Sequence, residues 1–271
     1  MIEWLTSLQG SGLENVHFST ILMVVLAGLA AGWVDAVVGG GGLIQLPILL
    51  LVPGITPVQA LATNKMGSIF GTATSAITYY RRAHPDLKTA LPMAFIALIG
   101  SFGGAIVATL LPAAVIKPVI VAALIAVLIF TALKPTAGTL TELKYDGAKH
   151  LSIAVLIGLT IGFYDGLLGP GTGSFLIIAM VMLLGYSFLD ASAKAKIVNL
   201  ATNAGALMFF LPSGHLLWGL GLILGISNMI GGYIGARMAI SKGAKFVRVI
   251  FLIVVSVLIL RLGWDVIVEW V

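Results

Sequence analysis

The chain has 271 residues, of which 59% are hydrophobic and only 9% charged; because about 25% of the residues in an ordinary soluble domain are charged, we predict one membrane domain. The net charge of +5 does not indicate a nucleic-acid partner, because the basic residues cluster in short loops between apolar segments, as in membrane proteins. The absence of cysteine excludes disulfides and thiolate catalysis, and no metal-binding motif or cofactor site is recognisable.

Apolar segments follow one another along the whole chain, and a helix needs roughly 20 such residues to cross a bilayer. In order they are about 18–52, 57–80, 89–111, 114–133, 150–186, 196–211, 216–240 and 246–262. The first and the fifth are too long for one simple span, and glycine interrupts both: VDAVVGGGGLIQLP (34–47) and FYDGLLGPGTGSFL (163–176). The pattern predicts an all-α polytopic membrane protein with two broken elements.

The segment before the first apolar run is acidic. It holds Glu3 and Glu14, and the first basic residue in the chain is Lys65. A cleavable secretory signal needs a basic start, so we expect none, and we expect the N-terminus to lie outside.

Matching residues recur at a spacing of about 130 and indicate two homologous halves, about 1–135 and 148–271. A polar linker, about 134–149, joins them within a single transporter domain of residues 1–271. The matched positions are Gly32 with Gly162, Asp35 with Asp165, Lys65 with Lys196, Gly103 and Gly104 with Gly231 and Gly232, and Lys117 with Lys245.

The loop charges bear on the orientation of the two halves. If each broken segment crosses the membrane once, the halves are parallel and the basic loop residues divide almost evenly. If each broken segment returns to its own side, as a re-entrant or hairpin element followed by three spans, the halves are inverted. Lys117 and Arg261 then fall outside, and the inside holds Arg81, Arg82, Lys88, Lys134, Lys144, Lys149, Lys194, Lys242, Lys245 and Arg248. The excess of inside charge favours inverted repeats.

The two glycine breaks point to a binding site. Non-helical backbone inside a bilayer is tolerated only where protein or a water-filled cavity satisfies its polar groups, and broken helices of inverted repeats often point half-helix N-termini at an anion near the midplane. A tight helix crossing explains a single break, but two matched breaks favour a central site. The predicted backbone lining is Gly39, Gly40, Gly41, Gly42, Gly169, Gly171, Thr172, Gly173 and Ser174.

Ionisable and amide side chains accompany the breaks. Asp35 and Asp165 lie four residues before them, where a buried carboxylate can exchange a proton; the alternatives are a cap for nearby N–H groups, a lysine partner or coordination of Na⁺. The cationic counterparts are Lys65 and Lys196. With Gln45, Thr63, Asn64, Ser68, Asn199, Thr202 and Asn203 they supply donors for a small oxyanion, although such residues also serve as polar contacts between helices.

These motifs resemble those of the sulfite exporter TauE/SafE family of bacterial membrane transporters. The resemblance rests on VDAVVGGGGLIQLPILL followed by ALATNK, on YDGLLGPGTGSFL and ASAKAKIVNLATNAGAL, and on GGYIGARMA (231–239), and it covers essentially the whole chain. It implies a carrier that exports a small sulfur-containing anion, such as sulfite or an organosulfonate. It also maps the polar helix starts onto 63–65 and 194–196, where LATNK and SAKAK differ, so the two half-sites are not equivalent.

The sequence therefore predicts a secondary carrier for a small anion, with alternating access as one half rocks against the other. It lacks a nucleotide-binding loop, so H⁺ or Na⁺ is the expected coupling ion. An anion channel and a structural membrane subunit are alternatives, as is an intramembrane enzyme using Asp35 and Asp165, although neither aspartate follows a Gly-x-Gly sequence. The small residues of GGYIG suit either internal packing or a homodimer.

Overall fold

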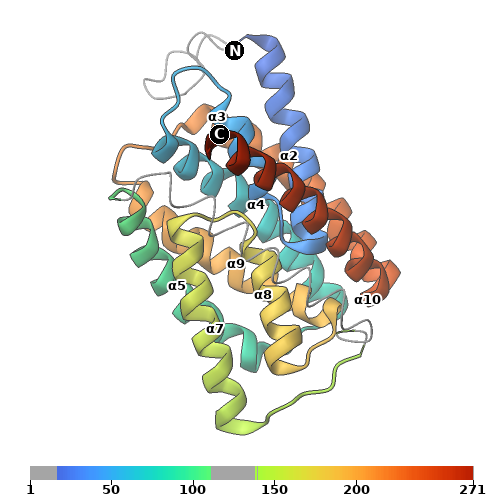
Figure 1. Ribbon diagram of the computed structural model, residues 1–271. Coiled ribbons are helices and arrows are strands. Elements are labelled where there is room, and N and C mark those ends of the chain that lie inside the picture. The colour runs from blue at the N-terminus through green and yellow to red at the C-terminus, as the bar shows by residue number, and fades with distance from the viewer. Residues whose placement is uncertain (1–16, 111–137, 139, 271) are drawn as a thin grey trace.

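The computed structural model describes residues 17–110, 138 and 140–270, and within these ranges all regular structure is helical. The helices form an elongated bundle (Figure 1), which confirms the predicted all-helical class. Four described helices are long and apolar enough to cross a membrane: Phe18–Val38, Leu87–Ala108, Gly147–Leu167 and Trp218–Ile253. The predicted segment 114–133, with Lys117, and the residues Glu3, Glu14 and Lys134 lie outside the described part of the chain.

The first broken element is a helical hairpin. Helix α2 (Phe18–Val38) ends at Gly39, which has a φ of 78° and donates its N–H to Asp35 O at 2.8 Å. A left-handed residue at this position stops a helix and favours glycine. Helix α3 (Gly42–Leu50) begins directly afterwards and runs back toward the end of the bundle at which α2 started (Figure 1).

The second broken element has the same construction. Helix α7 (Gly147–Leu167) is followed by Gly169 and Gly171, with φ of 85° and 80°. Helix α8 (Thr172–Ala179), continued by the π-helical turn η2 (Met180–Leu184), returns toward the start of α7. The two hairpins thus open toward opposite ends of the bundle, as inverted repeats require. Because residues 111–137 are not described, the inverted relation of the complete halves stays a prediction.

Three of the remaining described helices are continuous, and the fourth is kinked. They are α4 (Pro57–Ala83), α5 (Leu87–Ala108), α9 (Phe188–Phe210) and α10 (Trp218–Trp270). Thr56 and Gln59 form a capping box at the start of α4, ahead of Pro57 in its first turn, a combination that favours a helix start. The predicted segments 216–240 and 246–262 are both parts of α10, which turns sharply at Gly243, where φ is 75°.

Glycines hold pairs of helices in close contact. A Cβ atom at Gly32 of α2 would lie 2.2 Å from Asn228 O of α10, and one at Gly104 of α5 would lie 2.0 Å from Phe163 O of α7. Such backbone-to-backbone contact is typical of helix pairs in membranes. Gly231 and Gly235 of the GGYIG stretch face α2 in the same way. These two glycines therefore serve internal packing, and a homodimer stays a prediction.

Candidate functional site

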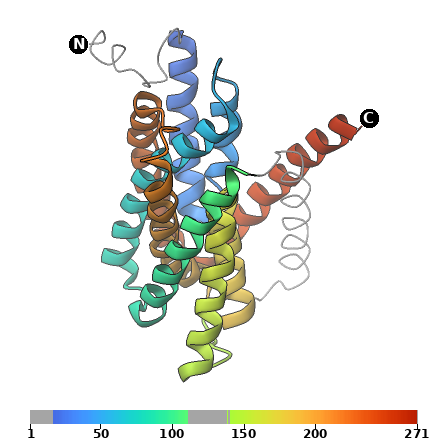
Figure 2. The same cartoon turned by 90° about the vertical axis from the view of Figure 1, so that its left-hand side faces the viewer.

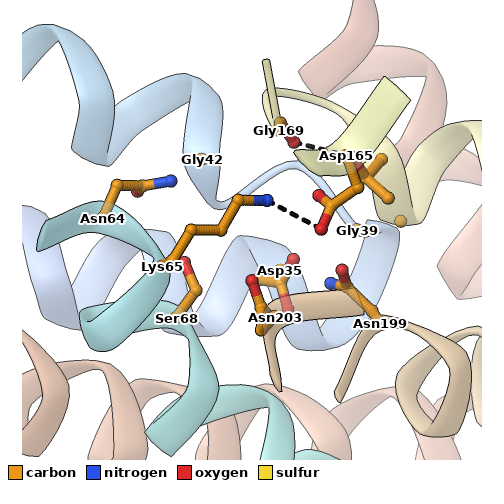
Figure 3. A pocket seen from close by; sticks show the side chains of 12 residues that line it. Asp35, Gly39, Gly42, Asn64, Lys65, Ser68, Asp165, Gly169, Asn199 and Asn203 are labelled. Atoms are coloured by element: carbon orange, nitrogen blue, oxygen red, sulfur yellow. Dashed lines mark hydrogen bonds and ion pairs between the residues drawn. The ribbon is translucent and has the colours of Figure 1, made fainter. Parts of the chain in front are cut away.

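The two breaks meet at a small polar cavity between α4 and α9 (Figure 3). Its lining residues come from both halves of the chain: Asp35, Gly39, Gly42, Asn64, Lys65, Ser68, Asp165, Gly169, Thr172, Gly173, Asn199 and Asn203. The volume that the centre of a water molecule can occupy in this cavity is about 10 Å³. A cavity needs roughly 10–15 Å³ of such volume to hold one water molecule. In this conformation the cavity holds no more than about one water molecule, and we call the site closed in this sense.

The breaks contact one another through their backbones. Ser174 donates its N–H to Gly39 O at 3.1 Å and its hydroxyl to Val38 O at 2.7 Å. A Cβ at Gly39 would lie 2.1 Å from the carbonyl carbon of Gly173, so neither position has room for a side chain. Helices α3 and α8 both begin beside this contact, and the first N–H groups of a helix lack partners within it.

One buried ion pair joins α4 to α7. The ammonium Nζ of Lys65 lies 2.7 Å from Asp165 Oδ2, and both side chains are 2% exposed. Figure 3 shows the Lys65 ammonium pointing at the Asp165 carboxylate, with Gly169 close by. A Cβ at Gly169 would lie 2.9 Å from Lys65 Nζ, so the lysine needs glycine there as well as the carboxylate.

The second ion pair joins α9 to α2. Lys196 Nζ lies 2.9 Å from Asp35 Oδ2 and also donates to the main-chain oxygen of Asp35. This ammonium therefore serves as a cap for a carbonyl in the last turn of α2. Lys196 is fully buried and does not line the cavity, in contrast to Lys65.

Each pair takes its lysine from one half and its aspartate from the other. The four charges sum to zero, so the closed site is neutral. Removing one partner of a buried pair costs about 3–5 kcal/mol because the other charge is left uncompensated. The pairs consequently connect the two halves at the cavity, and either can open only if another charge or a proton replaces the lost partner.

The amides around the cavity are only partly satisfied. Asn203 donates to Thr72 Oγ1 at 3.2 Å, and Gln45 Oε1 accepts from Ser68 at 2.9 Å. The Gln45 Nε2 and Asn64 Oδ1 atoms are buried and have no hydrogen-bond partner among the described residues. A buried polar atom without a partner costs about 1–3 kcal/mol, so both groups favour a ligand or a change of conformation.

Comparison with known proteins places the chain in a family. A family model for Sulfite exporter TauE/SafE matches residues 24–262. The chain belongs to this family. TauE/SafE relatives include the probable membrane transporter protein ORF9 of Sinorhizobium sp., 37% identical over 93% of this chain and 96% of its own length, and the probable membrane transporter protein YfcA of Escherichia coli K12, 33% identical over 91% of both. A probable membrane transporter protein of Haemophilus influenzae is 28% identical over 93% of this chain and 97% of its own. No solved structure matches.

This TauE/SafE protein is accordingly a membrane transporter and not an enzyme, and the resemblance noted in the sequence is confirmed. Its multi-pass location in a bacterial membrane agrees with the spanning helices of the described part. Within that same part, no cluster of three or more histidine, aspartate or glutamate side chains is arranged to hold a metal ion.

The TauE/SafE fold gathers most of the predicted site residues, but not all of them line the cavity. Those at its wall are Asp35, Gly39, Gly42, Asn64, Lys65, Asp165, Gly169, Thr172, Gly173, Asn199 and Asn203. The predicted residues that do not line it are Gly40, Gly41, Gln45, Thr63, Gly171, Ser174 and Lys196. Thr63 instead accepts a hydrogen bond from Leu217 N at 3.2 Å, and Gln45 reaches the site through Ser68.

Two tyrosines at the breaks were not singled out from the sequence. Tyr79 donates to Ala36 O at 3.0 Å, and Tyr164 donates to Pro170 O at 2.6 Å. Both hydroxyls satisfy carbonyl groups that the interrupted helices leave free. The sequence offered one signal, since Tyr164 directly precedes Asp165 in the glycine-rich motif.

Proposed function

We propose that the protein is a secondary carrier that exports a small sulfur-containing anion, such as sulfite or an organosulfonate, with H⁺ as the coupling ion. The observation that carries the proposal is the meeting of two buried lysine–aspartate pairs at one closed cavity between two helix breaks. Export and the sulfur-containing class follow from the family description. The half-helix N-termini at the breaks supply further donors for an anion.

Binding of the anion is an exchange of partners at Lys65. The anion takes the place of the Asp165 carboxylate beside the ammonium. The displaced carboxylate stays buried, and burial without a cation favours its protonated form. An anion of one negative charge therefore enters together with one proton, and the loaded site is as neutral as the empty one. Because this coupling is reversible, the gradients of the anion and of the proton together determine the direction of net flux, and export requires an outward anion gradient that exceeds any inward pH gradient.

Lys65 rather than Lys196 is the exchanging lysine. Lys65 lines the cavity and contacts a carboxylate alone, whereas Lys196 lies behind the cavity and is held by both the carboxylate and the main-chain oxygen of Asp35. Two of the buried polar atoms without partners among the described residues, on Asn64 and Gln45, belong to the surroundings of Lys65, Gln45 through Ser68. This difference accounts for the unequal half-sites implied by the sequence.

The site supports H⁺ better than Na⁺. Sodium requires several oxygen ligands that are free to coordinate it, and the oxygens at the end of α2 are already engaged. Asp35 O accepts from Lys196 and from the Gly39 N–H, Ala36 O accepts from Tyr79, and Val38 O accepts from Ser174. The two carboxylates face lysines, so a proton is the cation that the site can accept by changing partners.

Gly169 provides a test of the position of Lys65. We expect Gly169→Ala to lower anion flux by roughly tenfold or more, since a loss of about 1.4 kcal/mol in binding is already tenfold and the new Cβ would lie 2.9 Å from Lys65 Nζ. Gly54→Ala is the matched control: its φ of 81° is as strained for alanine, but nothing lies within 4 Å. Equal flux in the two variants would show that Gly169 does not position the lysine.

Flux into proteoliposomes tests the proposed function. Radiolabelled sulfite and a panel of small sulfonates and carboxylates are offered to purified protein, with and without an acidic exterior. A carrier gives saturable flux that unlabelled substrate competes away and that the acidic exterior drives inward. Flux that rises linearly with concentration would instead support a channel, and the absence of flux for every anion would refute the substrate class.

A further inference from the structure

Within the described part of the chain, the most extensive helix contacts cross between the two halves. Helix α10, from the second half, packs along α2 and α4 of the first. Helix α5, from the first half, packs along α7 and α9 of the second, and Figure 2 shows α5 beside α7. Among the described residues, α4 and α5 do not pack along one another although they are consecutive in the chain.

In these contacts between the halves, the helix backbones lie close together and hydrogen bonds connect the paired helices. Glycines bring the backbones of α2 and α10, and of α5 and α7, together along several turns. Hydrogen bonds add to them: Ser75 of α4 donates to Gly232 O of α10 at 3.3 Å, and Ser101 of α5 donates to Thr202 O of α9 at 2.7 Å. Tightly packed helices without space between them move as one unit.

The contact between α4 and α9 has a different character. It carries the cavity, the Asn203 to Thr72 hydrogen bond of 3.2 Å and side chains with unsatisfied polar atoms. Both ion pairs lie at the same boundary, because Lys65 of α4 reaches α7 and Lys196 of α9 reaches α2. Polar contacts that can exchange partners are able to adopt two arrangements. The close backbone contact of Gly39 with Gly173 and the Ser174 to Gly39 hydrogen bond lie at this boundary as well.

We propose that the moving units of the carrier are not the two sequence halves but two bodies that exchange a helix. Body A consists of α2, α3, α4 and the part of α10 before Gly243, and body B consists of α5, α7, α8 and α9. Each body contains one broken hairpin, and the cavity and both ion pairs lie between the bodies. The proposal rests on the proposed carrier function, and it replaces the rocking of one half against the other that the sequence alone suggested.

Anion binding then acts on the boundary directly. When the anion replaces the Asp165 carboxylate beside Lys65, it removes one of the two ion pairs that hold body A to body B. The Lys196 to Asp35 pair remains and acts as the pivot, because its ammonium is also bound to the main chain of α2. Rocking of the sequence halves would instead break the glycine contacts of α10 with α2 and of α5 with α7.

Distance measurements between spin labels distinguish the two possibilities, and the cysteine-free chain needs no background substitutions. Two double variants share the label position Ile106 of α5. In Ile77→Cys with Ile106→Cys, the labels lie in the same half but in different bodies. In Leu151→Cys with Ile106→Cys, they lie in different halves but in the same body. All three side chains are exposed, at 51%, 39% and 38% for Ile77, Ile106 and Leu151, and all lie outside the site.

The measurement is double electron–electron resonance in nanodiscs, without anion and with saturating sulfite or another anion of the panel that carries flux. We expect the 77–106 distance to shift by several ångströms, as in hinge and rigid-body transitions, and the 151–106 distance to stay constant. A constant 77–106 distance, or a shift of 151–106 alone, would overturn the proposal while saturable flux leaves the carrier intact. Absence of flux for every anion would instead remove the carrier function on which the proposal rests.

Discussion

Replacement of Lys65 by alanine is expected to abolish anion transport while the protein still folds. The substitution removes the ammonium that lies 2.7 Å from Asp165 Oδ2 at the cavity wall. The ammonium is the proposed partner of the anion, a hydrogen bond to a charged group contributes about 1.5–3 kcal/mol, and each 1.4 kcal/mol is tenfold in an equilibrium constant. We therefore expect flux in proteoliposomes to fall by about 100-fold or more. The orphaned carboxylate takes up a proton, which limits the effect on folding.

Lys196→Ala is the matched control for this variant. Lys196 holds the last turn of α2 through both the carboxylate and the main-chain oxygen of Asp35, so its removal should lower the melting temperature in detergent more than Lys65→Ala does. Size-exclusion profiles separate the two effects. Transport by Lys65→Ala at the wild-type rate would remove this lysine from the site.

Substitution of Asp165 by asparagine is expected to uncouple anion transport from the pH gradient. Asparagine cannot take up the proton that accompanies the anion, so the unloaded site keeps an uncompensated Lys65. The anion can still be replaced by another anion, and we expect exchange of labelled for unlabelled substrate to persist. Net uptake driven by an acidic exterior should be lost. The two assays on one preparation of proteoliposomes provide the measurement.

Asp35→Asn distinguishes the roles of the two aspartates. Asp35 pairs with the lysine behind the cavity, so its amide variant should be less stable and yet remain sensitive to the pH gradient. A variant of Asp165 that accumulates substrate under a pH gradient as the wild type does would contradict the assigned role. Loss of the pH response in the Asp35 variant alone would transfer that role to Asp35.

The sequence allowed the fold class, the two broken hairpins and the family to be predicted. The predictions succeeded because their signals are local. Glycine clusters within long apolar runs require a break, as at Gly39 and Gly169, and the spacing of about 130 residues identified corresponding positions such as Asp35 and Asp165. The same local signals placed Lys65 and Asn64 near the breaks, where the structure has them at the cavity wall.

The partners of these residues could not be predicted, because they depend on which helices pack together. The sequence left open whether an aspartate pairs with a lysine, and the structure shows that Lys65 pairs with Asp165 and Lys196 with Asp35, each across the halves. The sequence also does not show which helix a given glycine contacts. Gly32 and Gly104 were recognised as repeated positions, but only the fold shows that they bring α10 to α2 and α5 to α7.

In the proposed mechanism the anion displaces a carboxylate, which then carries a proton. We would record internal pH with a trapped indicator while an inward gradient of an organosulfonate that carries flux, which does not itself titrate near neutral pH, is imposed on proteoliposomes that lack a pH gradient. We expect the interior to acidify, to an extent that saturates with the anion concentration and corresponds to one proton per singly charged anion. We expect Asp165→Asn to abolish this acidification. Saturable anion flux without any proton movement would contradict the proposed mechanism.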